Sequence, residues 1–254
     1  MDFTLKTYED FLKKLSENKI SVYGIADWIK LKPKNGILLR HDVDRKPKNS
    51  LKVAELEKKY NILSSYYFRI VKSSFNSSII KNIGNYNHEI GYHYEDLSLA
   101  KGDYKRAINL FENHLNQFRE ICSITTISMH GRPLSPYDNR DLWKTYNFED
   151  YKISGEAFLS IDYSDMYYFT DTGRSWSNDS LNLRDNVKNS LQADLKNTAS
   201  LIQFILNNKN AKIAVITHPE RWSNTLIEHL IDSLKDSVIN MIKRVIKFIR
   251  KNDD

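Results

Sequence analysis

Short apolar runs alternate with longer amphipathic segments along most of this chain. The apolar runs are rich in β-branched and aromatic side chains, which is typical of buried strands. They lie at residues 37–39, 62–70, 88–94, 124–131, 166–173 and 212–219. Apolar residues that recur every three or four positions predict helices. These segments lie at residues 5–18, 46–60, 77–86, 103–121, 187–208 and 226–251, and a polar, irregular stretch occupies residues 132–165.

The regular alternation of strands and helices predicts a parallel sheet with helical crossovers. No internal repeat and no linker rich in Pro, Gly or Ser divides the 254 residues. We therefore expect a single α/β domain over residues 1–254, in which residues 223–254 form a basic C-terminal helix. The number of strand–helix units favours a barrel-like fold over an open doubly wound sheet. In both folds, functional sites form at the carboxyl ends of the strands.

Ionisable and aromatic residues gather at the predicted carboxyl ends of the strands. Four of the seven histidines occupy such positions. The residues in question are His41, Asp42 and Asp44, then His93, then His130 with Arg132, then Asp171 with Arg174, and last His218 with Glu220, Arg221 and Trp222. Titratable groups at the end of an apolar strand are costly to bury without a partner or a function. This edge of the sheet is therefore the predicted functional site.

The segment RHDVD, residues 40–44, suggests a divalent metal site. Alternation along a strand places Asp42 and Asp44 on the same face, so that one carboxylate can bind a metal while the other acts as a base. Zinc readily accepts histidine nitrogen and aspartate oxygen, and a catalytic site keeps one position open. The alternative is a pair of aspartates in salt bridges with Arg40 and Arg45. Histidines at the ends of the other strands favour the metal site.

Four segments, LLRHDVD, HEIGYH, HGRP and ITHP, occur in this order and resemble the motifs of the polysaccharide deacetylase family. This family is carbohydrate esterase family 4, the chitooligosaccharide deacetylase homology domain. The resemblance extends over about residues 37–222. It implies a distorted (β/α) barrel with parallel strands and fewer than eight complete units. It also implies a hydrolase that uses a divalent metal, often zinc, to remove acetyl groups from sugars.

The resemblance implies a set of metal ligands with one departure. Asp44 matches the aspartate that binds the metal, and His93 matches the first histidine of the second motif. The second histidine of that motif is expected at position 97, where this chain has Leu97. His130, at the neighbouring strand end, is the first candidate for the missing ligand. Weaker candidates are His41, Glu95 and Asp96.

The catalytic residues also follow from the resemblance. Asp42 matches the aspartate that acts as the base, and Arg132-Pro133 matches the arginine–proline motif that orients the base. His218 matches the general acid at the end of the last strand. No G-x-S-x-G segment is present, which is consistent with hydrolysis that needs no serine nucleophile.

Two aromatic segments are candidates for binding a sugar. Asp171, Arg174 and Trp176 follow one strand, and Trp222 follows the last strand. Trp176 and Trp222 can stack on a sugar ring, while Asp171 and Arg174 can bind hydroxyl groups or a phosphate. The alternatives are a tight turn with a structural ion pair, and tryptophans that cover the core.

Charge and cysteine content narrow the class of protein. The net charge is +6 and the pI is about 9.1, but lysines are scattered over most predicted helices, so nucleic-acid binding is not favoured. The single cysteine, Cys122, and the absence of an apolar N-terminal signal lead us to expect a cytoplasmic protein. The amphipathic segment 226–251 either packs on the barrel or makes a peripheral contact with an anionic membrane.

The sequence thus predicts a metal-dependent carbohydrate deacetylase. The expected substrate is an N-acetylated sugar, a nucleotide-linked or lipid-linked precursor in the biosynthesis of a surface polysaccharide. Leu97 supports the alternative, a carbohydrate-binding relative that has lost its metal centre. The presence of Asp42, Asp44 and His218 argues against that alternative, because a binding protein needs no base, ligand and acid together.

Overall fold

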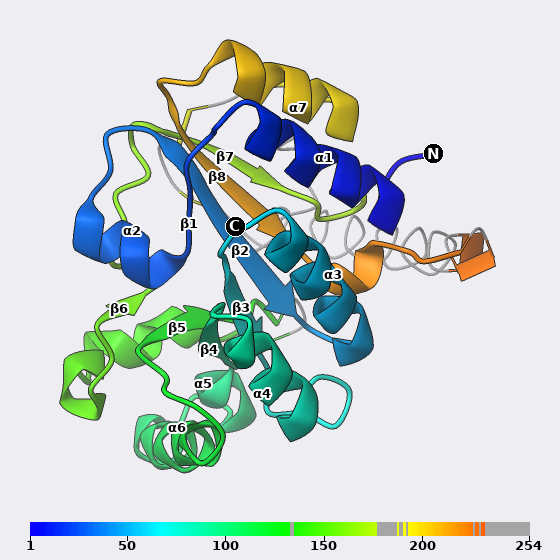
Figure 1. Ribbon diagram of the computed structural model, residues 1–254. Helices are drawn as coiled ribbons and strands as arrows, with labels where there is room; N and C mark the ends of the chain where they lie inside the picture. The colour runs from blue at the N-terminus through cyan, green and yellow to red at the C-terminus, as the bar shows by residue number, and fades with distance from the viewer. Residues whose placement is uncertain are drawn as a thin grey trace, which may run out of the picture.

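One curved sheet of parallel strands, covered on its outer side by helices, makes up the computed structural model (Figure 1). The structure describes residues 1–132, 135–176, 187, 190–191, 193–225, 227–228 and 230–231. The strands are β1 (Val22–Tyr23), β2 (Gly36–Val43), β3 (Ser65–Phe68), β4 (Glu89–Tyr94), β5 (Thr126–Met129), β6 (Gly155–Glu156), β7 (Met166–Thr170) and β8 (Lys212–Thr217). Their order is β6-β5-β4-β3-β2-β8-β7, and β1 pairs with the start of β2.

The sheet curls into an incomplete barrel. Every pairing between these strands is parallel, and no pairing between β6 and β7 closes the barrel within the described residues. Parallel strands require crossover connections, and these are mostly helical here. The predicted fold class, a distorted (β/α) barrel with incomplete topology, is confirmed.

The helices lie along the outer side of the sheet. They are α1 (Leu5–Glu17), α2 (Ile25–Leu31), α3 (Pro47–Lys59), α4 (Ser77–Asn85), α5 (Asp96–Leu99), α6 (Tyr104–Arg119) and α7 (Thr198–Asn207). Three 3₁₀ turns, η1 (Asn139–Lys144), η2 (Phe148–Tyr151) and η3 (Pro219–Arg221), follow the later strands. Figure 1 shows α1 between α3 and α7, so that the N-terminal helix covers β2 and β8 from outside.

Strand β2 is the centre of the fold and carries the residues of interest. All eight of its residues are buried, and it lies between β3 and β8. Its side chains alternate between two environments. Arg40 and Asp42 point into the barrel, where the guanidinium of Arg40 lies over the ring of Phe158. His41 points outward to Glu57 of α3.

One predicted helix begins later than expected. The segment 187–208 was expected to be helical throughout, but α7 starts only at Thr198. Asn197 caps this helix, because its side chain accepts a hydrogen bond from the amide of Ser200 while the Ser200 hydroxyl accepts one from the Asn197 amide. Leu191 instead pairs with Tyr167 as an extended bridge. The strands β1 and β6 and the helices α2 and α5 were not expected from the pattern.

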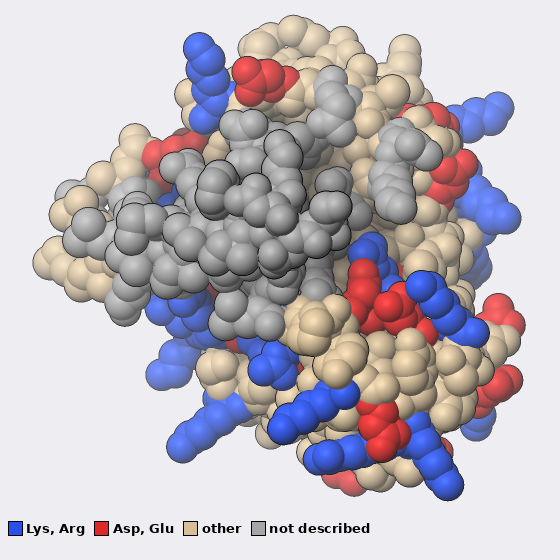
Figure 2. Space-filling view, turned by 180° about the vertical axis from the view of Figure 1, so that it is seen from behind, with Lys and Arg blue, Asp and Glu red and all other residues tan. Residues whose placement is uncertain are grey.

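The predicted basic helix at 223–254 cannot be followed for most of its length, because residues 226, 229 and 232–254 lie outside the described part of the chain. Among the residues that the structure does describe, no helix combines the length and apolar character needed to cross a membrane. Figure 2 shows the face opposite to that of Figure 1. Where described residues are visible there, basic side chains alternate with acidic ones around the surface and form no continuous patch.

Candidate metal centre and catalytic groups

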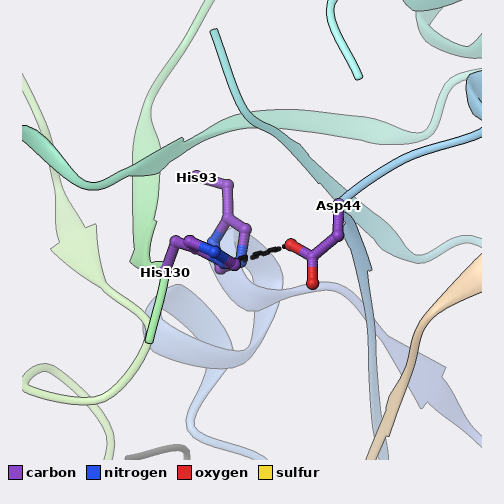
Figure 3. Close-up of side chains that lie close together, drawn as sticks. All are labelled: Asp44, His93 and His130. Carbon is purple, nitrogen blue, oxygen red and sulfur yellow. Dashed lines mark hydrogen bonds and ion pairs between the residues drawn. The ribbon is translucent and has the colours of Figure 1, made fainter. Parts of the chain in front are cut away.

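Three predicted ligands from three different strands meet at the carboxyl end of the sheet (Figure 3). Asp44 follows β2, His93 lies in β4, and His130 follows β5. His130 Nδ1 lies 3.0 Å from Asp44 Oδ1 and 3.2 Å from His93 Nε2. His93 Nε2 lies 3.6 Å from the same Asp44 oxygen. Residues far apart in the sequence are adjacent here because parallel strands all end at one edge.

The geometry of this triangle is suitable for a divalent ion. Zinc ligands about 2.1 Å from a tetrahedral ion are roughly 3.4 Å from one another, close to the three distances found here. His93 Nδ1 lies 3.0 Å from the carbonyl oxygen of Ser128 and must therefore donate to it. This hydrogen bond places the proton of a neutral His93 on Nδ1 and directs the lone pair of Nε2 toward Asp44, as is usual for histidine ligands. The residues present therefore fit a divalent metal.

The protonation states agree with this arrangement. Burial and the neighbouring His130 lower the pKa of His93 to about 3, so its Nε2 is free to bind a metal at neutral pH. Burial opposes the charged form of His130, but the Asp44 carboxylate outweighs it and raises the pKa of His130. Burial likewise opposes the charged form of Asp44, yet the two imidazoles hold its pKa well below the usual range. His130 Nδ1, which lies between Asp44 Oδ1 and His93 Nε2, thus occupies the place where an ion would bind.

His130 is placed where it could supply the ligand that Leu97 does not. Leu97 is 1% exposed and lies in α5, within the hydrophobic core. The weaker candidates are engaged elsewhere. Glu95 binds Arg69, Asp96 binds His114 and Tyr92, and His41 binds Glu57.

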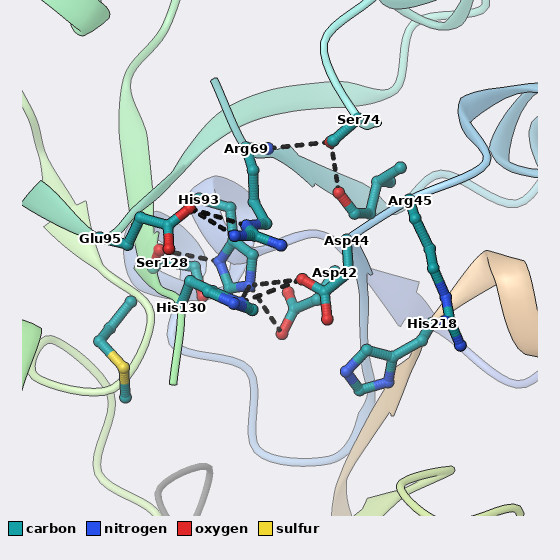
Figure 4. Close-up of polar contacts among 12 residues, drawn as sticks. Asp42, Asp44, Arg45, Arg69, Ser74, His93, Glu95, Ser128, His130 and His218 are labelled. Atoms are coloured by element: carbon teal, nitrogen blue, oxygen red, sulfur yellow. Dashed lines mark hydrogen bonds and ion pairs between the residues drawn. The ribbon is translucent and has the colours of Figure 1, made fainter. Parts of the chain in front are cut away.

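Asp42, the predicted base, lies beside the metal triad (Figure 4). Its Oδ2 is 4.0 Å from His93 Nε2 and accepts a hydrogen bond of 3.0 Å from Arg40 Nη2. Its Oδ1 is buried and has no hydrogen-bond partner among the described residues. A buried carboxylate oxygen without a partner is costly. Asp42 Oδ1 is therefore the atom available to a water molecule or a substrate.

The arginine that orients Asp42 is not the predicted one. Arg132 was expected to hold the base, but its Nε lies 3.5 Å from Glu95 Oε2, and Pro133 lies outside the described residues. Arg40 takes this role, because residues two apart on a strand share a face. The pair is almost fully buried, with side chains 1% and 3% exposed. The period-two pattern of RHDVD contained this signal, since it places Arg40 and Asp42 together.

His218, the predicted acid, lies on the other side of the two aspartates from His93 and His130 (Figure 4). Its Nδ1 is 2.7 Å from Asp171 Oδ1, and its backbone amide donates to Asp171 Oδ2. Burial and Arg221 disfavour the imidazolium, but the Asp171 carboxylate outweighs both and raises the pKa of His218. Because Nδ1 is occupied by Asp171, Nε2 is the nitrogen that can give a proton to a substrate.

The position of Asp171 after a strand had suggested that it binds the substrate. The structure instead surrounds Asp171 with partners from the protein. It is fully buried and accepts four hydrogen bonds. The donors are the His218 amide, the His218 ring, Arg221 Nη1 and Trp222 Nε1. Asp171 orients His218, and only the pairing of β7 with β8 brings the two residues together.

The other predicted substrate contacts are Arg174, Trp176 and Trp222, and the two tryptophans lie inside the core. Trp176 and Trp222 are each 1% exposed and pack against Phe3 and against each other, so neither ring is available to a sugar. Trp176 Nε1 donates to Thr198 Oγ1. Arg174 donates to the carbonyl of Arg221, which ties the loop after β7 to η3. Trp222 also donates to Asp171, the partner of His218, so these residues support the position of His218.

Glu220 is a further buried carboxylate, which the sequence placed at the end of the last strand without a role. It is 3% exposed, and its Oε2 has no hydrogen-bond partner among the described residues. Burial and the negative charge of Asp44 raise the pKa of Glu220 to about 7. Arg45 Nε lies 3.7 Å from its Oε1. Its position in HPERW, two residues after His218, was the only signal available.

Comparison with solved structures finds carbohydrate esterases. A mutant of BA3943, described as a carbohydrate esterase family 4 pseudoenzyme, matches with a TM-score of 0.43 and 14% identity over 83% of this chain. This chain spans 63% of that structure, which is less than two thirds of its length. Wild-type BA3943 from Bacillus anthracis matches with a TM-score of 0.44 and 12% identity, over 76% of this chain and 70% of that one.

PdaA of Bacillus subtilis, described as a family 4 carbohydrate esterase, matches with a TM-score of 0.39 and 15% identity over 88% of this chain and 81% of that one. No family model and no curated protein matches the sequence. The solved structures belong to the family whose motifs the sequence resembles. The functional conclusion below depends on the side chains of the site and not on these matches.

Proposed function

We propose that this chain is a metal-dependent deacetylase that hydrolyses the acetamido group of an N-acetylated sugar. One observation supports the proposal above all others. Within the described residues, Asp44, His93 and His130 form a triad suited to a divalent ion. Beside the triad lies Asp42, whose Oδ1 has no hydrogen-bond partner among these residues. Across from it lies His218, whose imidazole is paired with the buried Asp171. Amide hydrolysis needs an activated water, a base and an acid at one point, and this arrangement offers groups for each.

Each residue has a distinct part in the proposed reaction. A divalent ion held by Asp44, His93 and His130 would polarise the acetyl carbonyl and lower the pKa of a water molecule. Asp42 accepts the proton of the attacking water at Oδ1, while Arg40 holds Oδ2. His218 then donates its Nε2 proton to the departing amine, and Asp171 keeps the imidazole oriented. The C–N bond breaks, and acetate and a free amino sugar are the products.

The proposal also names a metal and a class of substrate. Two imidazole nitrogens and one carboxylate oxygen are a ligand set that zinc accepts, and we propose zinc as the ion. We propose a nucleotide-linked or lipid-linked sugar precursor of a surface polysaccharide, deacetylated in the cytoplasm, as the substrate. Peripheral membrane contact through residues 226–251 stays a prediction, because most of that segment lies outside the described residues.

Elemental analysis of the purified protein tests the metal centre. We expect about one divalent ion per chain, lost in Asp44→Ala and His93→Ala and retained in Asp42→Asn. Asp10→Ala, on the exposed side of α1, is a matched control that should also retain the ion. Acetate release from N-acetylated amino sugars should require the ion and Asp42.

The alternative, a carbohydrate-binding protein without a metal centre, followed from Leu97. His130 lies with Asp44 and His93 in the candidate triad, and we propose it as the ligand that Leu97 does not supply. The same experiment decides between the two. Absence of metal after incubation with zinc or cobalt, together with sugar binding, would establish the binding protein.

A further inference from the structure

Two arginines at the edge of the metal centre share one buried glutamate. Glu95 follows β4 and is 1% exposed. Arg69 donates to its Oε1 through both Nε, at 2.9 Å, and Nη2, at 2.6 Å. Arg132 Nε lies 3.5 Å from the other oxygen, Oε2, which accepts no hydrogen bond from any described residue. One carboxylate thus positions two guanidinium groups, and the cluster retains an excess of one positive charge.

The cluster lies directly at the metal site. Figure 4 shows Arg69 paired with Glu95 beside His93, in the same group of side chains as His130 and the two aspartates. Glu95 lies two residues after His93 and Arg132 two residues after His130, so the cluster and the candidate ligands share the same strand ends. The Arg69 amide donates to Ser74 Oγ, and that hydroxyl donates to the carbonyl of Val43, the residue before the proposed metal-binding aspartate. Arg69 is therefore held in place relative to that ligand.

The two guanidinium groups still have donors to offer. The Arg69 side chain is 19% exposed and that of Arg132 is 40% exposed. Arg69 Nη1 and both terminal nitrogens of Arg132 make no hydrogen bond to any residue that the structure describes. The buried carboxylate of Glu95 thus orients both arginines, and each keeps guanidinium donors that no described residue occupies.

We propose that Arg69 and Arg132, oriented by Glu95, form a subsite for a phosphate group carried by the substrate. Planar guanidinium groups bind phosphate oxygens through paired N–H donors, and they keep their charge at all physiological pH values. A neutral polysaccharide has no group that requires two arginines beside the acetyl-binding centre. This inference rests on the proposed function, in which the metal centre holds the acetamido group of the substrate. It adds that the same substrate carries a phosphate group.

Binding measurements test the subsite without requiring turnover. The full-length Asp42→Asn protein is titrated by calorimetry with N-acetylglucosamine, with its 1-phosphate and with its uridine diphosphate conjugate. We expect a clear preference for a phosphorylated sugar, and the better of the two phosphorylated probes identifies a monophosphate or a diphosphate substrate. The double variant Asp42→Asn/Arg132→Gln is titrated in the same way. The ratio of its affinities for phosphorylated and neutral sugar should be about tenfold lower, because a charge-assisted hydrogen bond contributes about that factor to binding.

Arg106→Gln is the matched control, because Arg106 is exposed on α6, away from the site. It should leave that ratio unchanged, and Arg69→Lys should reduce it while keeping the charge, since lysine lacks the paired donors. Equal affinity for neutral and phosphorylated sugars would overturn the subsite, as would an equal loss in the Arg106 control. Acetate release without phosphate preference would refute the subsite alone. Phosphate preference without acetate release by the protein with Asp42 intact would refute the deacetylase alone.

Discussion

The two faces of β2 carry buried polar groups that differ in how fully they are satisfied. On the outer face, His41 contacts Glu57 of α3, whose two oxygens also accept hydrogen bonds from Tyr8, Ser64 and Tyr66. On the inner face, Asp42 Oδ1 and two nitrogens of Arg40 have no hydrogen-bond partner within the described residues. Neighbouring residues of one strand thus belong to two different kinds of polar cluster.

The difference shows how to recognise a binding site among buried charges. A saturated network, like that of Glu57, stabilises the fold and leaves no atom for a ligand. An unsaturated group at the end of a strand is costly to the folded state unless a ligand completes it. His41 and His88, which both contact Glu57 on the outer face, are therefore structural. The inner face is the one to which we assign the proposed reaction.

The largest expected effect comes from Asp42→Asn, which removes the base on the inner face. Acetate release should fall about a thousandfold, as is typical for loss of a general base. Metal content and the midpoint of thermal unfolding should stay close to those of the parent protein, because the carboxamide oxygen of the new side chain can still accept the hydrogen bond from Arg40. A parallel loss of metal would show that Asp42 is a ligand rather than the base.

Glu57→Ala should break the outer network instead. It removes the common acceptor of four buried donors, so we expect the free energy of unfolding to fall by ~3 kcal/mol or more. Denaturant unfolding measures this loss. Glu55→Ala, exposed on the same helix, is the control and should cost much less. A small loss in Glu57→Ala would mean that the network is not what holds α3 to the sheet.

The outer network should also impose a pH dependence on stability. Burial raises the pKa of Glu57, but His41 and its other partners outweigh burial and hold that pKa at about 2, below the ordinary value of 4.5. A carboxyl group with a depressed pKa contributes stability above its unfolded-state pKa and loses it as the pH falls. The unfolding free energy should therefore decline between about pH 5 and pH 2. Glu57→Gln should flatten this decline, and an unchanged slope would contradict the assignment.

The smallest expected effect concerns the inner face again. Asp171→Asn removes the negative charge that raises the pKa of His218, so the imidazolium should lose its proton at a lower pH. The alkaline limb of the profile of kcat/KM against pH should shift to lower pH. At about pH 8 the rate should fall about tenfold for each unit of that shift. An alkaline limb that stays in place would show that His218 is not the acid.

Sequence alone determined the elements that local pattern controls. Alternating apolar runs and amphipathic segments specified the parallel sheet, and the strand ends specified Asp42, Asp44, His93, His130 and His218, because parallel strands deliver their carboxyl ends to one edge. The sequence also offered His130 as the candidate for the ligand missing at Leu97, since His130 follows the strand next to β4.

Only the tertiary structure decided which partner each charged group chose. Arg132 pairs with Glu95, and Asp171 binds His218. The uncharged Trp176 packs in the core against Phe3. Each of these contacts joins residues that are far apart in the chain. Leu191, which was expected to lie in a helix, likewise pairs with Tyr167 instead. Hydrogen-bond partners and burial depend on which strands and helices pack together, and that packing is a property of the whole chain rather than of any one segment.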